Sequence, residues 1–296
     1  MGRRLLAVAL LFLLACSSSG NGPGGADVPR GTTLRNVQFC SPGGFPLRMD
    51  LYFPDEPSTR PVLVFVHGGA WVTGTKEEAN ERWLGLLRAP LVARGFIVAS
   101  IEHRLSPAHR WPAHVEDGAC AVRYLRAHAA EYGLDSGRIG AWGSSSGGHI
   151  VALLGTAADG DFATAEWAGF SSRVSPVVDL YGPADLTSDD WGPEDRAAFS
   201  LVFTTGDPAS PILVEASPVT LVSPGDAPFL IFHGDEDTVV PVSQSVALDA
   251  ALGGAGVASE LVVVEGGNHG LPAPTDPTEA QIVARIVDFF AARLQP

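Results

Sequence analysis

A glycine-flanked serine between a strand-like run and a helical run constrains the fold of this chain more than any other feature. Residues 143–147 read Gly-Ser-Ser-Ser-Gly and fit the pattern Gly-x-Ser-x-Gly. The run 138–142 before them is short and apolar, and residues 149–154 after them have a helical pattern. A strand, sharp turn and helix of this kind holds its central serine in a strained backbone conformation, while the glycines let the two arms approach. The pattern predicts a nucleophile elbow centred on Ser145.

Short apolar runs recur along the chain and alternate with helical patterns. The runs are rich in Val, Ile and Phe, as strands buried on both faces are. This alternation predicts an α/β fold with a central, mostly parallel eight-stranded sheet flanked by helices. The expected strands are residues 33–39, 48–53, 62–66, 96–101, 138–142, 174–181, 228–233 and 260–264.

Two amphipathic helices and one insertion complete the expected architecture. The first helix covers residues 115–129; Glu116 and Asp117 are expected to cap or brace it, and Gly133 to stop the helical segment. The last helix contains the apolar positions of 282–290. Residues 184–226 interrupt the alternation of strand-like and helical segments, because they are acidic and contain several prolines. We expect an irregular insertion there, acting either as a pocket wall or as a passive surface excursion.

The N-terminus has the layout of an export signal. Arg3 and Arg4 precede an apolar stretch over 5–14, which is too short to span a membrane as a helix. The sequence Leu-Leu-Ala-Cys that follows resembles the lipobox of bacterial lipoproteins, which implies lipidation of Cys16 and anchoring in a bacterial cell envelope. The alternative is ordinary secretion after cleavage near Ala15. We therefore expect a signal peptide at 1–15, a flexible tether at 16–31 and one α/β domain at 32–296.

Composition excludes several classes of protein. The chain has a net charge of −14, and the leader carries two arginines and no acids, so the exported part is more acidic still. An acidic chain is a poor nucleic-acid binder, because phosphate contacts need Lys and Arg. No apolar run after residue 16 is long enough to cross a bilayer, so the expected membrane contact is only through Cys16. No cluster has metal-ligand spacing, and neither a metal nor another cofactor is expected.

Two cysteines remain after Cys16. Cys40 and Cys120 could form one disulfide in an exported protein, but two cysteines cannot build a disulfide-dense scaffold. Cys120 lies in a helical pattern among alanines, where a free cysteine behaves as a small buried hydrophobe. Unpaired thiols are the favoured expectation.

A serine nucleophile needs a histidine to take its proton and a carboxylate to orient that histidine. In α/β folds with a nucleophile elbow, the acid follows the serine along the chain and the histidine follows the acid. The expected strand 228–233 leads into an acidic loop with Asp235, Glu236 and Asp237. The expected strand 260–264 leads into a glycine-rich loop that contains His269. The order fits, although the residues alone leave three candidate acids.

The run His67-Gly68-Gly69-Ala70-Trp71 directly follows the expected strand 62–66. Small residues let a backbone approach a substrate oxygen closely, and this loop belongs with the HGGG type that donates backbone N–H groups to an oxyanion. Three further histidines, His67, His149 and His233, lie beside these motifs. We expect them to be supporting polar residues with local hydrogen bonds.

Taken together, these motifs resemble the alpha/beta-hydrolase fold-3 esterases. The sequences that carry the resemblance are His-Gly-Gly-Ala-Trp at 67–71, Arg-Leu-Ser-Pro at 104–107, Pro-Ala-His-Val-Glu-Asp at 112–117, and residues 143–149 and 233–241. They look most like the feruloyl-esterase-like branch near the hormone-sensitive-lipase relatives, and the resemblance covers residues 33–294. The chain departs from that pattern at Ser144 and Ser146, where the hormone-sensitive-lipase type has Asp and Ala, and at Ala70, where it has a third glycine.

The resemblance implies a role for each motif residue. Ser145 would be the nucleophile, His269 the base, and Asp237 the acid, in the register His-Gly-x-x-Asp-x-x-Val-Pro. The oxyanion would be bound by the backbone N–H groups of Gly69, Ala70 and Ser146. Apart from the resemblance, we expect the aromatic side chains of Trp71 and Trp191 to contact substrate.

The expected function is that of a serine carboxylesterase acting on small-molecule esters with short or aryl acyl groups. An arylformamidase-like amide hydrolase is one alternative, because the Gly-Gly-x-Trp loop also resembles that of arylformamidases. A non-catalytic binding module on the same scaffold is the other, although no catalytic group is missing. The sequence predicts neither the natural ester nor the oligomeric state.

Overall fold

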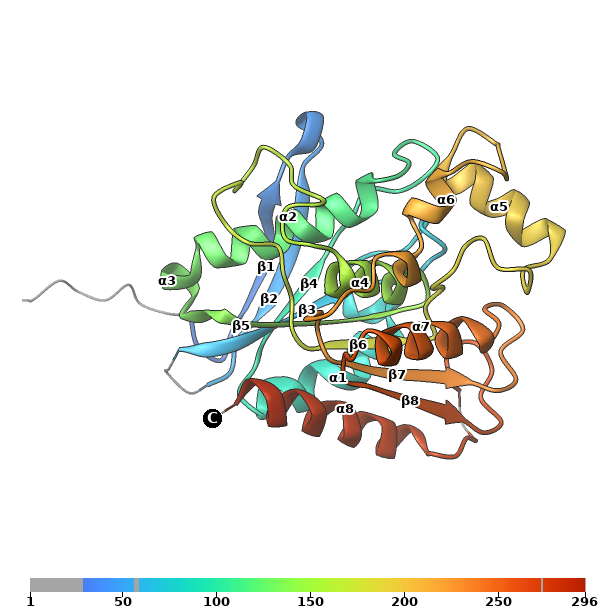
Figure 1. Cartoon of the computed structure of the whole chain (residues 1–296). Helices are drawn as coiled ribbons and strands as arrows, with labels where there is room; N and C mark the ends of the chain where they lie inside the picture. The colour runs from blue at the N-terminus through green and yellow to red at the C-terminus, as the bar shows by residue number, and fades with distance from the viewer. Residues whose placement is uncertain (1–28, 56–58, 273, 296) are drawn as a thin grey trace, which may run out of the picture.

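A computed structural model describes residues 29–55, 59–272 and 274–295 of the chain (Figure 1). The predicted signal peptide, Cys16 and most of the predicted tether lie outside these residues. Within them, no helix combines the length and the apolar character needed to cross a membrane.

The eight predicted strands form one sheet in the order β1-β2-β4-β3-β5-β6-β7-β8. β2 pairs antiparallel with both of its neighbours, β1 and β4. Every other pair of neighbouring strands in the sheet is parallel. The mostly parallel eight-stranded sheet of the sequence prediction is therefore confirmed. Its strands are β1 Thr33–Cys40, β2 Leu47–Tyr52, β3 Arg60–Val66, β4 Ile97–Ile101, β5 Leu134–Ser144, β6 Val177–Leu180, β7 Phe229–Gly234 and β8 Ser259–Val264.

Helices cover both faces of this sheet (Figure 1). The buried side chains of α1 and α8 belong to the core on one face, and those of α2, α4 and α7 to the core on the other. The main helices are α1 Arg82–Ala93, α2 Ala113–Ala127, α3 Ala129–Tyr132, α4 Ser146–Thr156, α5 Pro193–Phe203, α6 Ile212–Glu215, α7 Ser243–Gly254 and α8 Glu279–Leu294, with short 3-10 turns at Pro42–Gly44, Glu78–Asn80 and Pro218–Thr220. Gly133 ends α3 with a φ of 63°, as its predicted role as a stop requires.

The insertion between β6 and β7 is more regular than predicted. Residues 184–226 contain α5, α6 and a 3-10 turn rather than an irregular excursion. The prediction treated Pro193 as a break, but proline at the first position of a helix is already in the helical φ range and needs no N–H partner. Asp195 accepts a hydrogen bond from the Gly192 N–H at 3.0 Å, so the acidic residues start this helix.

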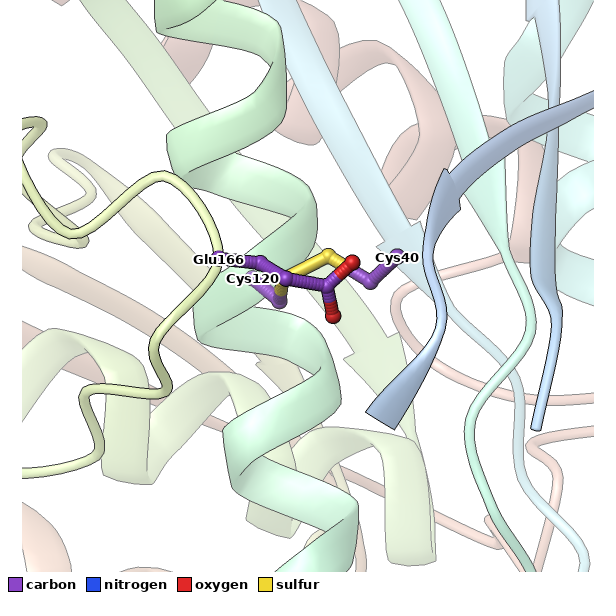
Figure 2. A group of neighbouring side chains, drawn as sticks. All are labelled: Cys40, Cys120 and Glu166. Carbon is purple, nitrogen blue, oxygen red and sulfur yellow. A yellow bond between two sulfur atoms is a disulfide. The ribbon is translucent and has the colours of Figure 1, made fainter. Parts of the chain in front are cut away.

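The prediction of unpaired thiols is wrong. Cys40 at the end of β1 and Cys120 in α2 form a disulfide, with Cα atoms 6.5 Å apart (Figure 2). Sequence could not reveal this contact, because the two cysteines are 80 positions apart and meet only when α2 packs on the sheet. Glu166 lies alongside, and both of its oxygens accept the Ser41 N–H at 3.0 Å. A disulfide that closes a loop of this length contributes about 4 kcal/mol in the chain-entropy description.

Cys40, Cys120 and Glu166 also form the one group in the described ranges whose donor atoms lie close enough together for a metal ion. The two sulfurs are bonded to each other, so they offer no thiolate while the disulfide is intact. We therefore assign this group a structural role.

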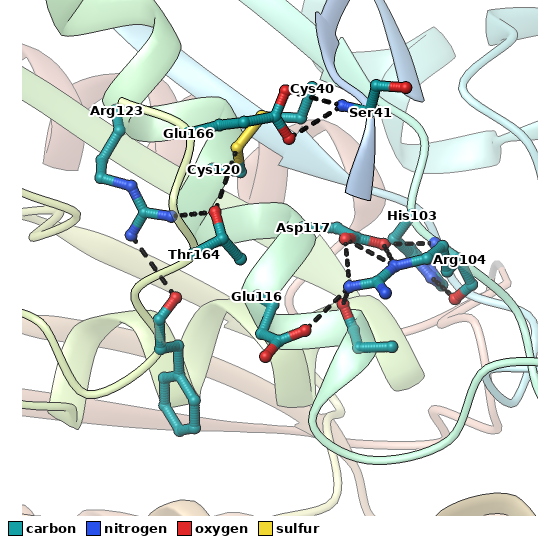
Figure 3. A network of polar contacts seen from close by, with 12 residues as sticks. Cys40, Ser41, His103, Arg104, Glu116, Asp117, Cys120, Arg123, Thr164 and Glu166 are labelled. Carbon is teal, nitrogen blue, oxygen red and sulfur yellow. Dashed lines mark hydrogen bonds and ion pairs between the residues drawn. A yellow bond between two sulfur atoms is a disulfide. The ribbon is translucent and has the colours of Figure 1, made fainter. Parts of the chain in front are cut away.

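The start of α2 is braced by a buried ion pair, in agreement with the prediction for Glu116 and Asp117. The Arg104 guanidinium lies 2.8 Å from the Asp117 carboxylate and 2.9 Å from that of Glu116 (Figure 3). Burial raises the pKa of Asp117 to about 6, although the bonds from Arg104 act in the opposite direction. This pairing fixes the loop after β4 against the helix that carries Cys120.

Candidate active site

Ser145 occupies a strained turn between β5 and α4. Its φ and ψ are 53° and −123°, a region that L-residues rarely adopt. The Ser145 N–H donates to the carbonyl of Leu180 at 2.9 Å, which ties the turn to the end of β6. A Cβ on Gly143 would lie 2.3 Å from the Gly147 carbonyl oxygen, and one on Gly147 would lie 2.1 Å from that of Val66. Glycine is therefore required at both positions, because the backbone segments meet there without room for a side chain.

The structure brings the predicted serine, histidine and acid together from three separate loops. The Ser145 hydroxyl lies 3.0 Å from Nε2 of His269, and Nδ1 of His269 lies 2.8 Å from Oδ2 of Asp237. Parallel strands place their carboxyl ends at one edge of the sheet, which is why residues after β5, β7 and β8 can meet. Asp237 accepts a hydrogen bond from the Nδ1–H of His269, which leaves Nε2 unprotonated and facing the serine hydroxyl.

Asp237 is held as a carboxylate by its surroundings. Its side chain is fully buried, and burial alone would raise its pKa. Hydrogen bonds outweigh that effect and lower the pKa of Asp237 well below its ordinary value; the donors are His233, His269 and the N–H groups of Val240 and Val239. The competing acid Asp235 instead accepts the Gly266 N–H at 2.8 Å. The geometry thus distinguishes two acids that the residues alone left open.

The loop after β3 lies directly beside Ser145. A Cβ on Gly68 would be 3.0 Å from the Ser144 carbonyl and 3.5 Å from the Ser145 Cβ. Gly69 and Ala70 both have positive φ, at 117° and 52°. Ser146 is the first residue of α4, where helical N–H groups have no partner within the helix. In the part of the chain that the structure describes, no backbone carbonyl accepts a hydrogen bond from the N–H of Gly69, Ala70 or Ser146.

The two predicted substrate-contact tryptophans are largely packed inside the protein. Trp71 and Trp191 are each 4% exposed. Trp71 packs edge to face on Phe203, with ring centroids 4.8 Å apart, and Trp191 packs on Phe199 at the same separation. The structure therefore leaves little of either side chain exposed for contact with a substrate.

The three supporting histidines are buried and hydrogen-bonded, as predicted. His67 Nδ1 lies 2.7 Å from the Gly68 carbonyl, and His233 Nδ1 lies 2.7 Å from the Ser245 hydroxyl. His149 contacts Trp71 through one ring nitrogen and the carbonyl of Ala216 through the other. A cleft of about 570 Å³ is lined by His67, Gly74 and His103 among others, and Ser145 is not one of its lining residues.

Sequence reasoning missed two residues beside the triad. Tyr181 follows β6 with a φ of 48°, and its ring meets that of His269 edge to face at 4.8 Å. Its place after a strand that ends at the same edge was the available signal. Burial raises the pKa of Glu81 to about 7, against a hydrogen bond with the Gly68 backbone. Nothing in the local sequence around Glu81 indicates that contact.

The family assignment follows from residues 49–252, which match the family described as BD-FAE. The chain belongs to the BD-FAE family. Esterase LipC of Mycobacterium tuberculosis (strain ATCC 25618 / H37Rv) is similar to this BD-FAE member, with 37% identity over 199 residues, which cover 65% of this chain and 47% of LipC. The chain spans about half the length of the curated relatives that it matches first.

Solved structures extend the likeness of this BD-FAE member to most of its length. A truncated carbohydrate esterase from gut microbiota has a TM-score of 0.79 and 30% identity, covering 92% of this chain and all of that one. Thermogutta terrifontis esterase 2, phosphonylated by sarin, has a TM-score of 0.75 and 25% identity, covering 89% and 96% of the two chains. These neighbours confirm the α/β-hydrolase fold.

Proposed function

We propose that this protein is a serine carboxylesterase. The observation that carries the proposal is the continuous relay from the Ser145 hydroxyl through His269 to Asp237, with steps of 3.0 and 2.8 Å. Ser145 Oγ attacks the ester carbonyl while His269 accepts its proton and then returns it to the leaving alcohol. Water, activated by His269, releases the acid and restores the serine. The similarity to LipC and to two esterase structures supports this chemistry.

The oxyanion of each tetrahedral intermediate would be bound by the N–H groups of Gly69, Ala70 and Ser146. Two observations support this assignment: the loop with Gly69 and Ala70 approaches Ser145 at Gly68, and no backbone carbonyl of the described residues engages the three N–H groups. The N–H of Ser146 also belongs to the positive end of the α4 dipole, which favours a developing negative charge.

The proposed substrates have short or aryl acyl groups. Trp191, Phe199 and Phe203 of the insertion are apolar, yet they are buried against Trp71 and against one another. They leave little free apolar wall for a long acyl chain, and each methylene gains about 0.8 kcal/mol only when it is buried. Across C2 to C12 p-nitrophenyl esters, kcat/KM should be highest between acetyl and butyryl. A maximum at C10 or C12 would contradict this preference.

The relay itself is tested by a matched pair of acid variants. Asp237→Asn should lower kcat on p-nitrophenyl acetate by roughly 10⁴-fold, because the amide leaves His269 in the wrong tautomer. Asp235→Asn, two residues away, should retain most of the activity. Equal losses in the two variants would mean that the acid has been misassigned.

The two alternatives separate in the same assays. An arylformamidase-like enzyme would cleave an N-formyl aryl amide faster than the p-nitrophenyl esters, and a binding module would turn over neither. The ordered relay favours catalysis over binding, since a module has no need of an aligned base.

We also propose that the protein is exported and anchored in a bacterial cell envelope through a lipid on Cys16. The leader and lipobox carry this proposal, and the Cys40–Cys120 disulfide supports export because such bonds persist mainly in oxidising compartments. Cys16→Ser should move the protein from the membrane fraction to the soluble fraction with unchanged specific activity. Retention of the variant in the membrane fraction would contradict lipid anchoring.

A further inference from the structure

His149 makes two directed hydrogen bonds from a fully enclosed position. It lies on α4, one turn after Ser145, and is 1% exposed. The Trp71 indole N–H donates to its Nδ1 at 3.2 Å, and its Nε2 lies 2.7 Å from the Ala216 carbonyl oxygen. An indole can only donate and a carbonyl can only accept, so the ring must be neutral, with its proton on Nε2. Both partners therefore fix one tautomer.

The first partner, Trp71, belongs to a backbone segment that needs support. Ala70 and Trp71 have φ values of 52° and 60°, and each such residue costs roughly 1–2 kcal/mol. The loop is closed locally by the N–H groups of Val72 and Thr73, which donate to the Gly69 carbonyl at 3.1 and 3.0 Å. Those bonds shape the turn but do not orient it relative to Ser145. The Trp71 carbonyl accepts the Ser106 N–H at 2.9 Å, and the Trp71 side chain links the loop to α4 through His149.

The second partner, Ala216, belongs to the insertion. It directly follows α6 and is fully buried. The next residue, Ser217, accepts the Leu186 N–H at 2.9 Å, which ties the end of this segment to the beginning of the insertion. Phe203 of α5 packs on both Trp71 and His149, with centroids 4.8 and 5.6 Å away. The insertion therefore reaches the loop after β3 both directly and through the histidine.

We infer that His149 is a positioning residue for the oxyanion loop, and that it makes the geometry of that loop depend on the docked insertion. The inference rests on the proposed function, in which the N–H groups of Gly69 and Ala70 bind the oxyanion. His149 touches no reacting atom. It connects three parts of the protein whose relative positions must be kept: the helix that follows Ser145, the loop that carries Gly69 and Ala70, and the insertion. A small misplacement of the donors weakens transition-state binding more than substrate binding.

The test compares His149→Phe with Trp71→Phe on p-nitrophenyl acetate. The first replaces the ring and removes both bonds; the second removes only the indole donor. Each should lower kcat by roughly ten- to a hundredfold, less than the loss of a whole oxyanion donor, with KM within about threefold of wild type. The double variant should be little worse than His149→Phe, because the two changes break the same bond.

A conservative variant separates positioning from simple packing. Glutamine can accept through Oε1 and donate through Nε2, so His149→Gln should recover most of the kcat that His149→Phe loses. Trp142→Phe is the matched control for Trp71→Phe, because the Trp142 indole is fully buried and its N–H has no hydrogen-bond partner in the described structure. That control should keep wild-type kcat.

Outcomes that overturn the inference differ from those that overturn the function. A wild-type protein without ester hydrolysis would remove the proposed function. If wild type is active and the folded Trp71→Phe variant keeps full kcat, His149 does not position the loop. The same conclusion follows if kcat of His149→Gln is no higher than kcat of His149→Phe. The Trp71 indole N–H resonance gives a readout independent of turnover: it should exchange with solvent faster in His149→Phe than in wild type, and an unchanged rate would also contradict the inference.

Discussion

The elbow around Ser145 and the insertion between β6 and β7 both contain buried residues, but they are encoded differently. The elbow is specified by five consecutive residues, because its turn leaves no room for side chains at Gly143 and Gly147. The insertion is specified by aromatic contacts with distant segments, such as Phe203 against Trp71. Local sterics can be recognised from a short motif, whereas packing between distant segments cannot.

The largest expected effect tests the elbow. Ser145→Ala should lower kcat by roughly 10⁶-fold, as removal of a triad nucleophile does elsewhere, while the fold is kept. Ser144→Ala removes a neighbouring hydroxyl and should retain substantial activity. A fluorophosphonate probe should label Ser145 in wild type and nothing in the alanine variant. Labelling that persists after the substitution would show that the motif identifies the wrong serine.

The next effect tests whether the insertion is part of the core. Phe199→Ala should lower the free energy of unfolding by about 3 kcal/mol, because a 7% exposed ring packed on Trp191 would leave a cavity. Leu201→Ala on the same helix is the control, since Leu201 is 60% exposed and should change stability by less than about 0.5 kcal/mol. Urea denaturation measures both. If both variants lose only a little unfolding free energy, the insertion does not pack as part of the core. The insertion would then not be specified by its aromatic contacts with distant segments.

A smaller effect tests the steric requirement of the elbow. Gly147→Ala should destabilise the fold by about 2 kcal/mol, because the new Cβ would meet the Val66 carbonyl oxygen on β3. Gly253→Ala in α7 is the matched control; nothing lies within 4 Å of its Cβ position, so it should gain up to about 1 kcal/mol from helix propensity. Differential scanning calorimetry of both variants decides, and a stabilised Gly147→Ala would refute the close approach.

The smallest effect tests the junction of the two regions. Burial lowers the pKa of His149 to about 4, and its surroundings are Trp71, Phe203, Ala216 and the neighbouring His114. Between pH 6.5 and 4 the unfolded chain binds a proton there that the folded chain does not, so this histidine makes stability fall as the pH falls.

Glutamine does not titrate. The stability of wild type relative to His149→Gln should therefore decrease by up to about 1.4 kcal/mol per pH unit as the pH falls across that interval. Urea midpoints at several pH values measure the difference. A difference that does not vary with pH would show that His149 is already charged or exposed.

Most of the fold could be predicted from the sequence, because most of the parallel strands contain a continuous apolar run. Some observed strand boundaries differ from the predicted ones; for example, β5 begins at Leu134 rather than at residue 138. The positions of Ser145, Asp237 and His269 could be anticipated because each follows a strand whose end lies at the same edge of the sheet. Choosing Asp237 over Asp235 needed the family register at the sequence level, and in the structure the hydrogen bonds to His269 and Gly266 distinguish them.

The remaining features depend on contacts between distant residues. Cys120 lies in an alanine-rich helix that gives no hint of Cys40 across the sheet. Trp71 and Trp191 are predicted to contact substrate, yet Trp71 packs on Phe203, far along the chain, and Trp191 packs on Phe199 in the helix after it. Partner choice of this kind follows from three-dimensional packing, which a single sequence does not record.

The disulfide divides the chain into a closed ring and an open remainder. Residues 41–119 lie inside the covalent ring, and they include β2, β3, β4 and the loop at 67–71. Ser145, Asp237 and His269 all lie outside it. A protease that nicks the ring once cannot separate the segment with the oxyanion loop from the segment with the triad, because Cys40–Cys120 still joins them. A single cut in this half of the chain would therefore leave one connected molecule.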